Sequence, residues 1–135
     1  MVKLIVGLKG TGKTKALIET VNSAVETSHG SVVCLELGDK LRYDINYRVR
    51  LVDISEYGVS THEELCGFVY GMFASNHDIT DIFIDSALKM CGNDMEKFKT
   101  FFLHAAAFAE KNGVNLVVTS SVHAEELPEE LKKYL

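Results

Sequence analysis

A short apolar run that stops at a glycine-rich turn and passes into a helix is the feature that most constrains this chain. Residues 2–6 are almost all apolar, and the run ends at Gly7, as buried parallel strands do. After Gly12 apolar residues recur with helical spacing until His29 and Gly30, a pair that favours the end of a helix. The sequence therefore predicts a buried strand, a tight turn and a helix, in this order.

The turn itself, residues 7–14, fits the pattern G-x-x-x-x-G-K-[ST] without a mismatch. Its glycines let the backbone curl so that successive N–H groups point at an anion, which the positive end of the next helix also faces. A lysine in the seventh place supplies a mobile charge for β- and γ-phosphates, and the hydroxyl after it can ligate Mg²⁺. We therefore expect a phosphate site, with Thr14 as a metal ligand, made by Gly7, Lys9, Gly10, Thr11, Gly12, Lys13 and Thr14.

Four further apolar runs predict strands, at residues 32–35, 50–54, 81–85 and 114–119. The direction of the strand at 50–54 stays open, because residues 37–49 before it are polar, show no clear period and offer no crossover helix. Over much of the remaining chain, apolar residues recur with helical spacing. Strands that alternate with helices predict an α/β fold with three layers, α/β/α, around a mainly parallel five-stranded sheet, and residues 1–135 as a single domain.

The predicted helices carry start signals. Residues 60–63, Ser-Thr-His-Glu, form a capping box that opens the second helix. Asn93 or Asp94 is expected to cap the third, whose inner face holds Phe98 among other apolar residues. The only proline, Pro128, suits the first turn of a closing helix.

A second motif stands at the end of the strand predicted at 81–85, where three apolar residues precede Asp85. With the glycine-rich turn, it makes the sequence resemble the P-loop NTPase superfamily. In that comparison residues 7–14 are the Walker A motif and Asp85 ends the Walker B strand. The resemblance implies that Asp85 holds Mg²⁺, through water, opposite Thr14. An aspartate that caps the next helix is the alternative.

Within the superfamily, the order and spacing of the elements resemble a RecA-like core. The guanine-reading Asn-Lys-x-Asp segment of Ras-type GTPases is absent, and Leu8 stands where partition ATPases carry their signature lysine. The resemblance implies a catalytic carboxylate near the end of the second strand that orients water; Glu36 matches it best, Asp39 less well, and a solvated strand end is the alternative. Ser86 replaces the glutamate that often follows the Walker B aspartate, so we expect slow turnover by the isolated chain.

The chain also resembles short bacterial P-loop proteins that are loosely called PilT-like, or twitching-motility, ATPases. It matches them over the core and in the two nucleotide motifs. Pilus-retraction ATPases also carry acidic and histidine boxes between and beyond these motifs, and the boxes are missing here. The resemblance therefore does not extend to motor function.

Two further groups of polar residues each allow functional interpretations and a purely structural one. Residues 119–121, Thr-Ser-Ser, end a strand expected beside the strand of the glycine-rich turn, where a hydroxyl would sense a γ-phosphate or simply cap the next turn. The three arginines, Arg42, Arg48 and Arg50, fall within nine residues and suggest a phosphate clamp, an arginine finger or a nucleic-acid contact. A solvated loop is the simpler interpretation, because acidic residues lie among them.

The net charge and the cysteines indicate which partners and which cellular compartment to expect. The net charge of −5 gives no general attraction to nucleic acid or anionic lipid, so neither is an expected partner. The three cysteines are too scattered for a disulfide framework, and the histidines lack metal-ligand spacing. No apolar run approaches 18 residues and no signal peptide is visible, so we expect a cytoplasmic protein with reduced thiols.

The motifs, together with the resemblance and the missing guanine-reading segment, predict a protein that binds ATP with Mg²⁺ and hydrolyses the β–γ bond. Lys13 and the turn amides would stabilise charge, Thr14 and Asp85 would place Mg²⁺, and Glu36 would orient water, so the predicted catalytic residues are Lys13, Glu36 and Asp85. A homo-oligomer or a larger protein partner is compatible with the resemblance. Two alternatives stay open: a non-hydrolysing regulatory subunit, and a small-molecule kinase, although no arginine after position 50 offers the usual lid.

Overall fold

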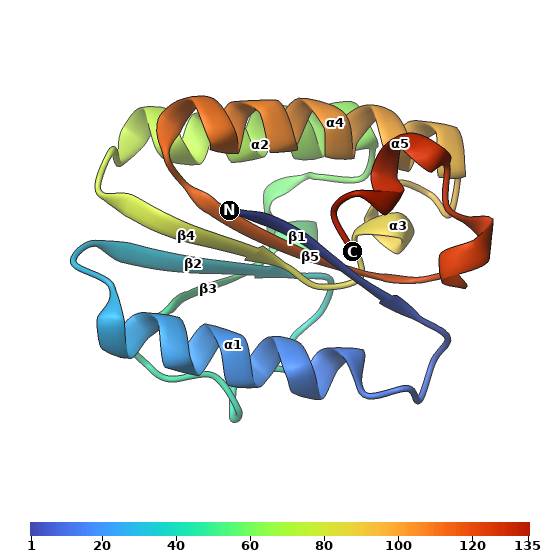
Figure 1. The fold of residues 1–135 in the computed structure, drawn as a ribbon. Helices are drawn as coiled ribbons and strands as arrows, with labels where there is room; N and C mark the ends of the chain where they lie inside the picture. The colour runs from blue at the N-terminus through green and yellow to red at the C-terminus, as the bar shows by residue number, and fades with distance from the viewer.

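The computed structural model describes residues 1–135 as a parallel sheet between two helical layers (Figure 1). Short 3-10 helices follow β3 and β5. The elements are β1 (Val2–Gly7), α1 (Lys13–Thr27), β2 (Ser31–Glu36), β3 (Arg50–Asp53), η1 (Ile54–Tyr57), α2 (His62–Ser75), β4 (Ile79–Ile84), α3 (Ala87–Met90), α4 (Met95–Asn112), β5 (Asn115–Ser121), η2 (Ala124–Glu126) and α5 (Glu129–Lys132). None of the helices combines the length and the apolar character that crossing a membrane would require.

The five strands lie in the order β1-β5-β4-β2-β3, and every neighbouring pair is parallel. This confirms the predicted sheet and settles the direction of the strand near residue 50, which runs parallel to β2 with Val52 opposite Leu35. Because all strands point the same way, their carboxyl ends meet at one edge, where parallel α/β sheets place their ligands. β5 separates the strand of the glycine-rich turn from the strand that precedes Asp85.

An irregular segment, residues 37–49, replaces the helix that usually covers a parallel crossover. Its buried side chains, Leu41, Ile45 and Val49, are four residues apart and share a core cluster with α1 and the facing strands. The sequence pattern of this segment appeared polar and without period because the three apolar residues are separated by charged and polar ones. The structure thus reveals a helix-like spacing that the sequence prediction missed.

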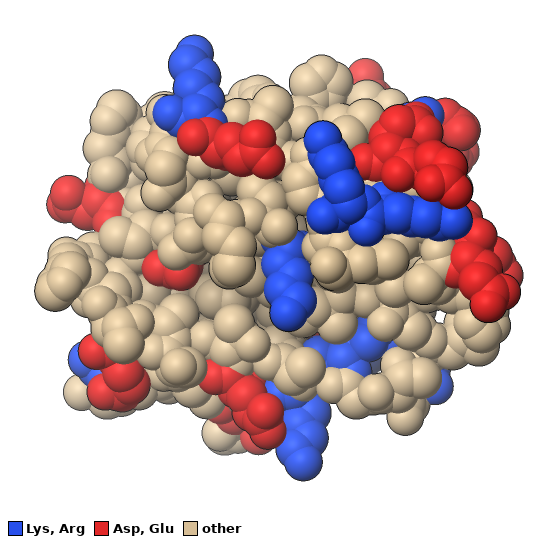
Figure 2. Space-filling model, viewed as in Figure 1, with Lys and Arg blue, Asp and Glu red and all other residues tan.

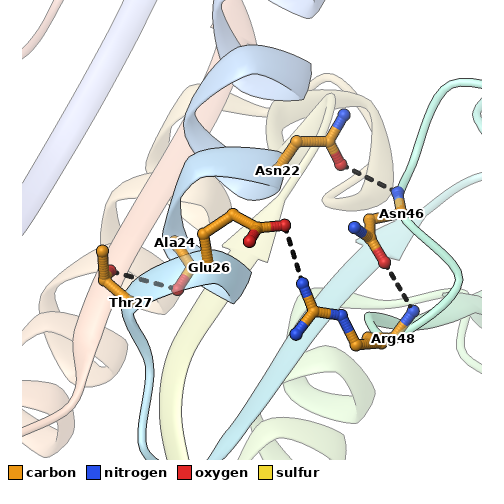
Figure 3. A network of polar contacts seen from close by, with 6 residues as sticks. All are labelled: Asn22, Ala24, Glu26, Thr27, Asn46 and Arg48. Atoms are coloured by element: carbon orange, nitrogen blue, oxygen red, sulfur yellow. Dashed lines mark hydrogen bonds and ion pairs between the residues drawn. The ribbon is translucent and has the colours of Figure 1, made fainter.

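Polar contacts also tie this segment to α1 (Figure 3). The N–H of Asn46 donates to Oδ1 of Asn22 at 2.8 Å, and the Arg48 guanidinium pairs with Glu26 at 2.7 Å. Both side chains of the ion pair are largely exposed, so it contributes at most about 1 kcal/mol. Arg48 therefore holds the loop on the helix, as expected of a solvated loop.

The other face of the sheet carries α2 and α4, which lie side by side (Figure 1). Here the larger core cluster has 26 buried residues, including Phe98, Phe101 and Phe102 of α4. Phe98 was predicted on the inner face of this helix, and it is fully buried, as is Phe102. This layer supplies most of the apolar burial that stabilises the sheet.

The starts of the helices match the sequence prediction only in part. The capping box of α2 uses Thr61 and Glu64, one residue later than predicted, and Glu64 also accepts from the N–H of Ser60 at 2.9 Å. The pattern fits both registers, and only the tertiary position of the helix selects one. Asp94 caps α4 as predicted, whereas the short α3 before it had no recognisable signal. Pro128 directly precedes α5, which has only four residues.

Gly30 lies where two segments approach too closely for a side chain. A Cβ there would lie 2.0 Å from the carbonyl oxygen of Asp78. Gly30→Ala is expected to lower the free energy of unfolding by about 1–3 kcal/mol, because Asp78 and the N–H of Ser31, which are hydrogen-bonded at 2.8 Å, must move. Gly71→Ala, on an exposed part of α2 with open space around it, should instead raise it by about 0.5–1 kcal/mol. Urea unfolding measures both, and a Gly30→Ala protein as stable as wild type would contradict the close approach.

Candidate functional site

A cleft of about 560 Å³ opens at the carboxyl edge of the sheet, within the size range of small-molecule sites. The glycine-rich turn, the start of α1, the ends of β2, β4 and β5, and residues after these strands line it. Two carboxylates, Glu36 and Asp85, face five lysine side chains in the lining. The lysines are Lys9, Lys13, Lys15, Lys40 and Lys89. In a chain with net charge −5, this local excess of positive charge suits an anionic ligand.

The turn between β1 and α1 has the backbone that its glycines predict. Gly10 and Gly12 have φ angles of +87°, which residues with a side chain rarely adopt. A Cβ on Gly7 would lie 2.5 Å from the hydroxyl oxygen of Thr11, so this position also needs a glycine. The amides of Lys9, Gly10 and residues 12–15 donate to no other protein group. The turn thus offers free N–H groups at the positive end of a helix.

Lys13 lies over the turn that precedes it. Its Nζ donates to the carbonyl oxygen of Leu8 at 3.0 Å, and the same oxygen accepts from the N–H and the hydroxyl of Thr11, at 3.2 and 2.7 Å. A phosphate oxygen would offer the ammonium group a charged acceptor in place of a neutral one. Because Thr11 retains both of its bonds to Leu8, Lys13 can leave this carbonyl without orphaning it.

Asp85 follows β4 and lines the cleft. Its Oδ1 accepts from the hydroxyl of Thr119 at 2.7 Å, and its N–H donates to the carbonyl of Leu35 at 2.9 Å. Oδ2 has only a long contact, 3.5 Å, with the hydroxyl of Ser86. The next helix begins after Ser86 and has no side-chain cap, so Asp85 is not the helix cap that the sequence offered as an alternative.

Glu36 ends β2 and lines the same cleft, although only 3% of its surface is exposed. Its Oε1 accepts from the N–H of Leu41 at 3.2 Å. Burial raises the pKa of this carboxyl and the charges of Asp53 and Asp85 add to the rise, while hydrogen bonds from the amides of Leu41 and Lys40 oppose it. The alternative of a solvated strand end is therefore wrong for Glu36. Asp39, by contrast, is exposed and does not line the cleft.

The structure separates the three hydroxyls at the end of β5. Thr119 is bound to Asp85, and Ser120 is buried and donates to the carbonyl of Thr119 at 2.8 Å. Only Ser121 is exposed and lines the cleft. None of the three arginines lines it, so the phosphate-clamp interpretation finds no support within one chain.

Four polar residues of the lining were missed by the sequence analysis: Lys15, Lys40, Lys89 and Ser86. Lys40 and Lys89 lie after β2 and after β4, far from the glycine-rich turn in the sequence. The one signal that could have found them is topological, because residues that follow parallel strands share the edge where the turn lies.

The oxygen donors in the cleft fit Mg²⁺. The chain has no group of three or more His, Cys, Asp or Glu side chains that could hold a metal ion. Mg²⁺ beside a nucleotide needs only one or two protein oxygens, with phosphates and water as the other ligands. Asp85 Oδ2 and the hydroxyl of Thr14 both belong to cleft residues, and the Thr14 hydroxyl makes no hydrogen bond within the chain.

Acidic side chains also gather on a surface that does not line the cleft. Figure 2 shows them over η2 and α5, where Glu125, Glu126, Glu129 and Glu130 are exposed. Glu129 pairs with Lys132 at 3.0 Å, and Glu130 pairs with Lys99. This cluster faces water, and it accounts for part of the net negative charge.

Comparison with known proteins bears on the fold. No protein-family model matches the sequence, and a search of curated proteins gave no match. Among solved structures, a KaiC-like protein of the hyperthermophilic archaeon Pyrococcus horikoshii is similar, with a TM-score of 0.69 and 16% sequence identity. The likeness covers 98% of this chain and 68% of that chain.

At this identity the likeness shows the fold and not the activity. The narrower resemblance to PilT-like ATPases gains no support from it. The predicted fold class is confirmed: the chain has an α/β fold with a five-stranded, all-parallel sheet that resembles a KaiC-like, RecA-like domain.

Proposed function

We propose that the chain binds ATP together with Mg²⁺ in the cleft and hydrolyses the bond between the β- and γ-phosphates. One observation carries the proposal: the free amides of Lys9, Gly10 and residues 12–15 and five lysines converge on a cleft that Asp85 and Glu36 also line. A triphosphate with a divalent cation matches this combination of many donors and few carboxylates. The RecA-like strand order supports it at the level of the fold.

Binding uses the part of the site that is already formed. The amides of Gly10 and residues 12–14 would donate to phosphate oxygens, and Lys13 would exchange the Leu8 carbonyl for the β- and γ-phosphates. Thr14 and Asp85 would hold Mg²⁺, which when bound neutralises charge on the phosphate oxygens. ATP is proposed over GTP because the guanine-reading segment is absent.

Hydrolysis requires a water molecule to attack the γ-phosphorus while the bond from this phosphorus to the bridging oxygen of ADP breaks. Glu36 would orient that water and take its proton, because it lines the cleft and one of its oxygens is held by the N–H of Leu41. Its raised pKa makes it a better base than an exposed glutamate. Since Ser86 follows Asp85, the isolated chain is expected to turn over slowly and to accelerate in a homo-oligomer or with a protein partner.

Calorimetric titration with ATP, ADP and GTP, with and without Mg²⁺, tests the binding part of the proposal. We expect ATP to bind more tightly with Mg²⁺ than without, and more tightly than GTP. A phosphate-release assay on the same protein tests hydrolysis and separates it from the kinase alternative, which needs an acceptor before γ-phosphate leaves ATP. No binding of any nucleotide at millimolar concentration would overturn the proposal.

A further inference from the structure

The hydroxyl of Thr119 both accepts and donates a hydrogen bond inside the protein. Thr119 is 1% exposed and lies on β5, between β1 and β4. Its oxygen accepts from the N–H of Ser86 at 2.9 Å and lies 2.7 Å from Oδ1 of Asp85. A threonine hydroxyl has one proton, and since Asp85 is the acceptor within reach, that proton is donated to Oδ1.

Two hydrogen bonds hold Asp85 in place. Oδ1 of Asp85 is held by Thr119, and the main-chain N–H of Asp85 is held by β2 at 2.9 Å. Oδ2 keeps only the 3.5 Å contact with Ser86, so it is the oxygen that stays available to a ligand in the cleft. The carboxylate therefore presents one oxygen in one orientation, instead of rotating between several.

Thr119 also supports the backbone directly after Asp85. Ser86 has a φ of +62°, a left-handed conformation that costs a residue with a side chain about 1 kcal/mol or more. The N–H of Ser86 donates to the hydroxyl oxygen of Thr119, and without this oxygen it would have no hydrogen-bond partner in the protein. Strain of this kind persists where the surrounding contacts over-determine the conformation, and here a single buried hydroxyl supplies the contact.

We propose that Thr119 is a positioning residue that sets Asp85 for the nucleotide-bound metal, and not a sensor of the γ-phosphate. This inference rests on the proposed function, because it assigns Thr119 a part in the same site. The hydroxyl cannot donate to a phosphate while it donates its only proton to Asp85, and its burial keeps it out of the cleft. Hydrogen-bonded partners of metal ligands act in this way in other metal sites.

The test measures how much Mg²⁺ strengthens ATP binding, as the ratio of ATP dissociation constants in EDTA and in Mg²⁺. Thr119→Val keeps the shape of the side chain and removes the hydroxyl, and Thr119→Ser keeps the hydroxyl. We expect Thr119→Val to lower the ratio by about tenfold or more while ATP affinity in EDTA stays that of wild type. Thr119→Ser should keep most of the wild-type ratio. If Thr119→Val does not fold, Thr119→Ala replaces it with the same expectation.

A double-mutant cycle shows whether Thr119 acts through Asp85. In an Asp85→Asn background, Thr119→Val should change the ratio no further, because the group it positions is gone. An unchanged ratio in Thr119→Val, or a full additional loss in the double variant, would overturn the inference. A failure of the proposed function gives a different result. In that case the wild-type protein itself would bind no ATP, or would bind it equally well with and without Mg²⁺.

Discussion

Glu36→Gln is expected to release phosphate from ATP about 10²–10⁴ times more slowly than wild type, the usual contribution of a general base. The substitution keeps the size of the side chain and an oxygen that can still accept from the N–H of Leu41. It removes the charge that would take a proton from water. ATP·Mg²⁺ affinity should change little, because the groups proposed to bind the phosphates lie on the glycine-rich turn. Steady-state phosphate release and calorimetry on the same preparation measure the two quantities.

Measuring the free energy of unfolding of the same variant tests whether misfolding is the reason for lost activity. Burial raises the pKa of Glu36, so the folded state disfavours its ionised form. Below the ordinary carboxyl pKa of about 4.3 the group is neutral in both states, and the cost grows as pH rises through the raised pKa of the folded state. Glu36→Gln does not titrate, and it should therefore be more stable than wild type at pH 7 and lose this advantage in acid.

Urea unfolding across this pH range measures the difference. A Glu36→Gln protein that is inactive and also less stable than wild type at pH 7 would refute the assignment of a buried, costly charge to Glu36. Undiminished phosphate release would show that Glu36 takes no part in the reaction. Of the roles proposed for the cleft residues, only those in binding ATP with Mg²⁺ would then remain.

Lys13→Ala is expected to lower the rate of phosphate release by about 10²–10³-fold, the cost of removing one preorganised charge-stabilising donor. It should also weaken ATP·Mg²⁺ binding by about tenfold or more, because a hydrogen bond to a charged group contributes about 1.5–3 kcal/mol. The turn itself should survive, since Thr11 keeps both of its bonds to Leu8.

Lys111→Ala is the matched control for this variant. Lys111 lies at the exposed end of α4, away from the cleft, and its removal changes the net charge equally. Its affinity and rate should equal those of wild type. If Lys13→Ala and Lys111→Ala bind ATP·Mg²⁺ equally well, the positive charge at position 13 has no specific role.

Local features of the structure follow from contiguous residues, and the sequence predicts them well. The turn at residues 7–14 needs glycines at positive φ and a helix beginning at Lys13, and both requirements are properties of neighbouring residues in the chain. The strand before Asp85 and the buried face of α4 were likewise predicted from short-range pattern. Such signals need no knowledge of what packs against them.

Choices between equivalent local patterns were decided by the tertiary structure. The capping box of α2 fits two registers in the sequence, and the packing of Leu65 and Val69 accompanies the one observed. The direction of the strand at Arg50–Asp53 was decided by its parallel pairing with β2. The segment before this strand makes the pairing possible, because it returns along α1 with Leu41 buried against the helix.

The composition of the site also depended on the order of strands in the sheet. The sequence alone determined a glycine-rich turn between a strand and a helix, a carboxylate at the end of a strand and an α/β alternation. Only the sheet order β1-β5-β4-β2-β3 brought Lys40 and Lys89 to the cleft, buried Glu36 in its wall and set Thr119 against Asp85. The physical reason is that these contacts join residues distant in the chain, and their distances depend on how whole elements pack, which no short stretch of residues encodes.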